Sequence, residues 1–202
     1  MRILSVLLFL TLSISANAQQ HSYDYIVNQY CKAVQEKKIL DLPKDKIIAE
    51  NIKIGKAIRQ ENSDTIDFIL KTIHQQNDTL SEMQALIAYS KIYIHTLIYG
   101  CSTYLQINRK AITECPKETK SLQYIALRID KYLTDNPNFT YQEVLDSTGT
   151  QMFYFSREIP KQIEQDYGDE FMHPMLIIQY LLHKNDTYFK AWLYMQTLKI
   201  IE

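Results

Sequence analysis

Glycine is scarce in this sequence: the 202 residues include only four, Gly55, Gly100, Gly149 and Gly168. Loops that bind phosphates or dinucleotides need several closely spaced glycines, because the backbone must approach the ligand closely. The wide spacing found here excludes such loops. Proline is also rare, with five residues, and long periodic apolar stretches lie between these helix breakers. Together these features predict an all-α fold.

The sequence also lacks the short motifs of common hydrolases. It contains neither H-E-x-x-H, the zinc motif of metalloproteases, nor G-x-S-x-G, the nucleophile motif of α/β-hydrolases. Glu170 and His173 have the i, i+3 spacing that places two metal ligands on one helix face, but a di-metal bundle needs a second such pair and two further glutamates. We therefore predict no metal, no cofactor and no enzymatic activity. The alternative is a metal-dependent enzyme that uses Glu170 and His173.

Neither sign of charge dominates the chain. With 22 basic and 23 acidic residues the formal net charge is −1, which gives no electrostatic reason to expect binding to nucleic acid or to an anionic membrane surface. Tyrosine, in contrast, is abundant, with 15 residues. Tyrosine suits helix packing with polar tips at the surface, and it also suits protein-binding faces. The tyrosine content therefore agrees with both of these uses.

Residues 1–18 have the order of a secretory signal peptide. Arg2 supplies a positive charge, the stretch Ile3–Ile14 is almost wholly apolar, and an A-N-A cleavage site ends at Ala18. A membrane-spanning helix needs about 20 apolar residues, which is more than this stretch contains. We expect cleavage after Ala18, a helical domain over residues 19–202, and a periplasmic or extracellular location without membrane insertion.

Apolar residues recur at helical spacing along the rest of the chain. The central pair is a long apolar helix, Leu80–Tyr99, and a second helix, Lys117–Leu133. A capping box over Thr79–Glu82 starts the first of them, and another over Thr140–Glu143 starts a later helix. We predict a single-domain helical bundle in which the other helices pack around the central pair.

The C-terminal third is less sharply defined by its pattern. Residues Gln151–Ile159 either continue a helix past Gly149 or form a short strand. Pro174–His183 and Thr187–Ile201 have helical spacing, but they contain enough β-branched and aromatic residues for a β-hairpin turned at Asn185–Asp186. We favour helices, with the hairpin as the alternative.

The sequence contains three cysteines, Cys31, Cys101 and Cys115. In an oxidising compartment an odd number indicates one disulfide and one further thiol. Cys101 follows the end of the first central helix and Cys115 precedes the start of the second. A bridge between them would stabilise that connection by roughly 3 kcal/mol in the chain-entropy model. We therefore predict a Cys101–Cys115 disulfide and an inert core thiol at Cys31.

The connection between the two central helices is the predicted contact surface for a partner. A binding protein needs a rigid surface with a few aromatic or arginine anchors, because ordering a side chain on binding costs about 0.5–1.5 kcal/mol. We expect this connection to be a loop that the disulfide holds in place. Its candidate contact residues are Tyr104, Gln106, Asn108, Arg109 and Lys110. The alternative is a loop that is merely solvated.

Cys115-Pro116, Gln123, Tyr132-Leu133 and Pro137 follow one another in the sequence, and Tyr93-Ile94 with Gly100 precedes them. Over residues 80–160 this pattern resembles the Tai-type amidase-immunity family of type VI secretion, which has a C-P…Q…V-x-x-Y-L…P signature and a preceding Y-I-x-G-x-x-D-G segment. The chain departs from the family pattern at Ser90, Thr96, Tyr99 and Lys161. The resemblance implies a small, secreted, disulfide-stapled helical protein that binds a peptidoglycan-cleaving amidase effector and blocks it. The alternative is a secreted helical protein with another structural or interaction role.

Overall fold

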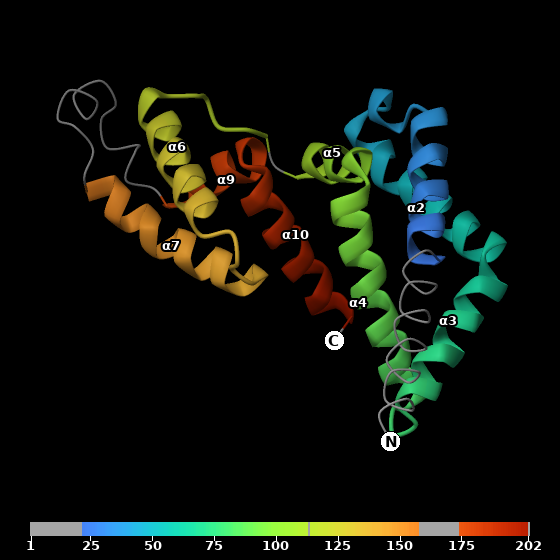
Figure 1. Cartoon of the computed structure of the whole chain (residues 1–202). Helices are drawn as coiled ribbons and strands as arrows, with labels where there is room; N and C mark the ends of the chain where they lie inside the picture. Colours follow the sequence, from blue (N-terminus) through green and yellow to red (C-terminus); the bar gives the residue numbers. More distant parts are fainter. Residues whose placement is uncertain (1–21, 113, 158–173, 202) are drawn as a thin grey trace, which may run out of the picture. The chain divides into compact units, whose positions relative to one another are not determined.

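The computed structural model describes residues 22–112, 114–157 and 174–201 (Figure 1). All regular structure in these ranges is helical and none of it is strand, which confirms the predicted all-α bundle. The contacts gather the chain into two compact units, unit 1 (Met1–Ile107 with Ile201–Glu202) and unit 2 (Asn108–Ile200). Within the described ranges no helix is both long and apolar enough to cross a membrane.

Some predictions fall on residues that are not described. The signal peptide over residues 1–18 lies outside the described residues, and so do Glu170 and His173. The β-hairpin alternative lies inside them and is wrong: Pro174–Lys184 (α9) and Asp186–Ile201 (α10) are both helices. The strand alternative for the stretch from Gln151 is also wrong as far as Arg157, because α7 continues to that residue.

The described part of unit 1 consists of helices joined by short corners. Its elements are a helix over residues 22–36, the 3₁₀ helix η1 (Ile39–Asp41), α2 (Lys44–Glu61), α3 (Ser63–Gln76), α4 (Glu82–Gly100) and the first part of α5 (Ser102–Ala111). Helix α3 packs against α2 and α4.

Two helix starts show why local sequence determines these boundaries. The Ser81 hydroxyl accepts the Gln84 N–H at 3.2 Å, and the Gln84 side chain accepts the Ser81 N–H at 2.8 Å. This capping box begins α4 two residues later than the predicted box over Thr79–Glu82. The predicted box at Thr140 is confirmed, because the Glu143 carboxylate accepts the Thr140 N–H at 2.8 Å and the Thr140 hydroxyl accepts the Glu143 N–H at 3.3 Å. Each box satisfies N–H groups that have no partner within the helix.

The core of unit 1 forms around the helix over residues 22–36. Its apolar face is buried along the whole length, at Tyr23, Ile26, Val27, Tyr30 and Val34. Isoleucines of α2 and α3 and the Tyr89 ring of α4 pack in the same cluster. The Tyr23 and Tyr89 rings stack with their centroids 5.5 Å apart. Some of the tyrosines, such as Tyr23 and Tyr89, therefore contribute to helix packing.

A buried amide fixes the corner between α2 and α3. Asn62 is 5% exposed, and its Nδ2 donates to the Gln29 side-chain oxygen at 2.6 Å and to the Ile58 carbonyl at 2.8 Å. The first bond ties the corner to the helix over residues 22–36. A buried amide needs such partners, because an unsatisfied one costs about 1–3 kcal/mol.

The disulfide of unit 1 joins Cys31 to Cys101, with the two Cα atoms 5.8 Å apart. The predicted Cys101–Cys115 pairing is therefore wrong, and Cys115 is an exposed free thiol. The reason is that the predicted loop after Cys101 is a helix, α5, of 10 residues. Such a helix carries the chain about 15 Å onward from Cys101 instead of turning it back, whereas the Cα atoms of Cys31 and Cys101 lie within the roughly 7 Å that a disulfide can span.

The described part of unit 2 contains the end of α5, α6 (Lys120–Asp135), α7 (Tyr141–Arg157), α9 (Pro174–Lys184) and most of α10 (Asp186–Ile201). Helix α6 packs against both α7 and α9. It begins three residues after the predicted start at Lys117, because Thr119 is its N-cap and the Thr119 hydroxyl accepts the Leu122 N–H at 3.2 Å. Figure 1 shows α6 and α7 side by side, in yellow and orange.

We predict that the Cys31→Ser variant unfolds at lower denaturant concentration than the native protein. The bridge spans 70 residues, and closing a loop of that length stabilises a protein by roughly 4 kcal/mol in the chain-entropy model. Urea unfolding followed by circular dichroism measures the difference. Cys115→Ser is the matched control and should leave the unfolding midpoint unchanged. A large loss in Cys115→Ser, with none in Cys31→Ser, would contradict the observed pairing.

Candidate binding pocket

The five residues predicted to contact a partner lie on helix α5 and not on a loop. Gln106 and Lys110 are exposed one helical turn apart. Tyr104 is half-buried and packs its ring edge-on against the Tyr30 ring at 6.0 Å. Asn108 follows Tyr104 by one turn. Helical spacing therefore places Tyr104 and Asn108 on one side of α5 and Gln106 and Lys110 on the other.

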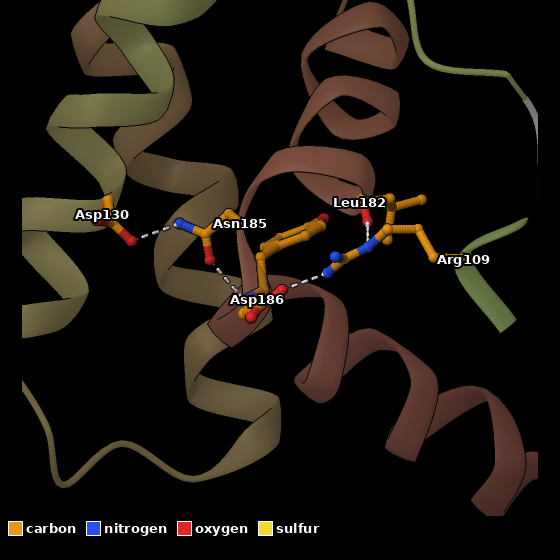
Figure 2. A network of polar contacts seen from close by, with 6 residues as sticks. Arg109, Asp130, Leu182, Asn185 and Asp186 are labelled. Carbon is orange, nitrogen blue, oxygen red and sulfur yellow. Dashed lines mark hydrogen bonds and ion pairs between the residues drawn. The ribbon is translucent and has the colours of Figure 1, made fainter. Parts of the chain in front are cut away.

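Arg109 has a structural role in unit 2. Its Nε donates to the Leu182 carbonyl at 3.1 Å, and its Nη2 pairs with the Asp186 carboxylate (Figure 2). Its guanidinium also lies over the Phe189 ring, 4.6 Å from the centroid. The Leu182 carbonyl is one of the last four of α9, where intrahelical donors run out. Arg109 thus connects the end of α9 to the first turn of α10.

Asn185 occupies the single position between α9 and α10. It is 4% exposed, its Oδ1 accepts the Tyr188 N–H at 2.8 Å, and its Nδ2 donates to the Asp130 carboxylate at 3.0 Å. The first bond is an N-cap of α10, and the second reaches α6. One amide therefore fixes the α9–α10 corner and also orients the Asp130 carboxylate, as Figure 2 shows.

A pocket of about 340 Å³ lies beside this corner. Helix α6 contributes four residues of one face, at positions i, i+3, i+4 and i+7, and α9 contributes two residues one turn apart. The lining residues are Gln123, Ala126, Leu127, Asp130, Tyr180, Lys184 and Asn185. Leu127 is apolar, but it is 70% exposed. Ligand pockets range from about 300 to 1,000 Å³, so this one has the size for a single side chain or a small molecule.

The cation of the pocket is held by a neighbouring carboxylate. The Lys184 ammonium lies 3.1 Å from a Glu118 oxygen, and this hydrogen bond raises the pKa of Lys184. Glu118 also accepts a hydrogen bond from Gln123. The bonds from Gln123 and then from Lys184 lower the pKa of Glu118. Both side chains are exposed, so the pair contributes little to stability, but it places a second carboxylate beside the Lys184 ammonium.

Cys115 lies near Lys184 and Tyr180, close to the pocket residues. Burial raises the pKa of the Cys115 thiol more than the Lys184 charge lowers it. A thiol acts as a nucleophile when its pKa is depressed, and that condition is not met here. Over the ranges that the structure describes, no group of three or more His, Cys, Asp or Glu residues is placed to hold a metal ion. The arrangement suits binding through an apolar wall and a fixed carboxylate.

Sequence reasoning missed this pocket. The sequence marks Gln123 only as part of the family-like pattern, and it does not mark Leu127 or Asp130 as site residues. The available signal was the row Gln123, Ala126, Leu127 and Asp130, which forms one helix face beside the buried face of Ile125 and Ile129.

We predict that Arg109→Ala destabilises the protein by about 1–3 kcal/mol, through loss of the Leu182 hydrogen bond and of the contact with Phe189. The ion pair to Asp186 contributes less, because Asp186 is 68% exposed. Arg109→Lys should recover less than half of the loss, since an ammonium lacks the planar fork. Urea unfolding measures this, with exposed Lys110→Ala as the control. Equal stability of the Arg109 and Lys110 variants would contradict the structural role.

A second prediction separates the two bonds of Asn185. Asn185→Ser keeps an acceptor for the Tyr188 N–H but removes the donor to Asp130, so it should cost about 1 kcal/mol. Asn185→Ala removes both bonds and should cost about 2–3 kcal/mol. Thr187→Ala, exposed two residues later, is the control for thermal unfolding. The order native, serine, alanine is expected, and a serine variant as unstable as the alanine variant would show that capping is unimportant.

No family model, curated protein or solved structure matches this chain. The support for a function therefore comes from the pocket on α6 and α9 and from the family-like pattern that runs from Cys115 to Pro137.

Proposed function

We propose that the protein is a non-enzymatic binding protein of the cell envelope, which recognises a protein partner through the pocket between α6 and α9. The observation that carries the proposal is a preformed pocket with an exposed leucine, Leu127, in its lining. Binding sites gain affinity when their side chains are already ordered, because each side chain ordered on binding costs about 0.5–1.5 kcal/mol. Here hydrogen bonds hold Gln123, Asp130, Lys184 and Asn185 before any ligand arrives.

The polar groups of the pocket favour binding over catalysis. General acid–base chemistry needs a group with a pKa near the working pH and a nucleophile or base within reach of it. Contacts move Lys184 and Glu118 away from that range, with the pKa of Lys184 raised and that of Glu118 lowered. Partial burial likewise raises the pKa of the Cys115 thiol, the opposite of the shift that activates a nucleophilic cysteine.

The proposed partner is a peptidoglycan-cleaving amidase, and the protein is proposed to act as its immunity protein. The partner class comes from the resemblance to Tai-type immunity proteins, carried by Cys115-Pro116, Gln123 and Tyr132-Leu133. The same segment contributes to the pocket. Gln123 lines it, and Leu133 lies on the buried face of α6. A secreted inhibitor of such an enzyme meets it in the envelope, which agrees with the expected signal peptide and with a protein that contains a disulfide.

The proposal is tested with purified amidase effectors of the type VI secretion system from the source organism. The native protein should form a complex with one of them and stop its digestion of purified peptidoglycan. Leu127→Asp should weaken the complex by about 10–100-fold, because it removes roughly 1.5–3 kcal/mol of apolar burial. Calorimetric titration gives the affinity, and an assay of released muropeptides gives the inhibition.

Ile48→Asp is the matched control for that experiment. Ile48 is an aliphatic residue on α2 of unit 1 and is 51% exposed, so its substitution should leave both affinity and inhibition unchanged. Absence of any complex with the amidases would contradict the immunity function. A complex that Ile48→Asp abolishes and Leu127→Asp leaves intact would contradict the assignment of the pocket.

A further inference from the structure

We infer that the pocket between α6 and α9 receives an arginine side chain of the partner protein, paired with the Asp130 carboxylate. This inference rests on the proposed function, because it names the chemical group that the same pocket takes. It follows from three features: the excess of carboxylates over cations when the Lys184–Glu118 ion pair is counted with the lining, the fixed position of one carboxylate, and the apolar wall beside that carboxylate.

The lining and the ion pair beside it contain two carboxylates, those of Asp130 and Glu118, and one ammonium, that of Lys184. Two charged side chains line the pocket, those of Asp130 and Lys184. The Lys184 ammonium is paired with Glu118 at 3.1 Å and lies 6.0 Å from the centre of the Tyr180 ring. Among the described residues, the side-chain contact of the Asp130 carboxylate is with the neutral amide of Asn185. The lining and its immediate ion pair therefore favour a cationic ligand.

The Asp130 carboxylate is also held in a defined orientation. The hydrogen bond from Asn185 uses its Oδ1, and Asn185 is itself fixed because its own Oδ1 accepts the Tyr188 N–H at 2.8 Å. The Asn185 bond leaves Oδ2 and a second lone pair of Oδ1 to accept further donors. A guanidinium pairs with such a carboxylate through two parallel N–H bonds, which adds geometric specificity to the charge.

The rest of the lining fits the stem of an arginine. Ala126 and Leu127 precede Asp130 by one turn on the same face of α6, and Tyr180 of α9 also lines the pocket. An arginine side chain combines an apolar methylene stem with a planar charged head. A lysine would offer a more strongly hydrated point charge, which gains less from an exposed carboxylate. An acidic side chain would have to displace Glu118 from Lys184.

The experiment uses the ¹⁵N-labelled protein and three small probes, N-acetyl-arginine amide, its neutral isostere N-acetyl-citrulline amide, and N-acetyl-glutamate amide. Titration is followed by NMR at the Asn185 side-chain amide and at the backbone amides of Leu127 and Asp130. The arginine probe should give saturable shifts at these groups, with an affinity at least about tenfold higher than that of citrulline, since only arginine carries the charge. The glutamate probe should give none.

Asp130→Asn is the decisive variant. Its amide oxygen can still accept the bond from Asn185, so the corner should stay folded, while the charge that attracts arginine is removed. The variant should lose binding of the arginine probe, whereas Lys184→Gln should keep it. Thermal unfolding of both variants confirms that each is folded at the temperature of the titration.

The inference would be overturned by the absence of an arginine-dependent shift, by equal binding of arginine and citrulline, or by undiminished binding in folded Asp130→Asn. Stronger binding of the glutamate probe would assign the pocket to an anionic group and reject arginine. The proposed function is tested separately. A complex with the amidase that is insensitive to Asp130→Asn refutes only the arginine contact, whereas arginine binding without any amidase complex refutes only the partner.

Discussion

The candidate pocket depends on one buried amide, because Asn185 is the single residue that ends α9 and begins α10. Two successive helices leave unsatisfied carbonyls and N–H groups at their junction, and Asn185 satisfies one of them while it bonds to Asp130 on α6. Arg109 satisfies a carbonyl on the other side of the same junction. The corner is therefore held from both sides, and the pocket lies beside it.

Unit 1 also contains a helix corner that a buried asparagine fixes. Asn62 lies between α2 and α3, is buried, and bonds both to the end of α2 and to the helix over residues 22–36. In each unit a buried asparagine thus links a tight helix corner to a third helix. Hydrogen bonds at such a corner contribute only about 1 kcal/mol each when made, but leaving a buried amide unpaired costs more. This asymmetry keeps the corner in one arrangement, and a binding site needs such a fixed arrangement.

Local sequence predicted the helices well, and it predicted the tertiary contacts poorly. The capping box at Thr140 and the apolar face from Tyr23 to Val34 depend on residues within one or two turns, so pattern alone could find them. The Cys31–Cys101 bridge joins residues 70 positions apart, and no local pattern distinguishes it from the shorter pairing with Cys115. The sequence predicts a loop where α5 lies, because Cys101 and Cys115 delimit the connection between the two central helices. The role of Arg109 and the pocket were not predictable, since both depend on how α9 and α10 meet other helices.

The central claim is that the pocket of α6 and α9 contacts the partner. Site-specific photo-crosslinking tests it most directly, with p-benzoylphenylalanine placed at Leu127, or at Gln106 on α5 for comparison, in the presence of the amidase. The account predicts a covalent adduct with the amidase from position Leu127 and none from Gln106. An adduct from Gln106 with none from Leu127 would contradict it, and would return the contact surface to the exposed side of α5.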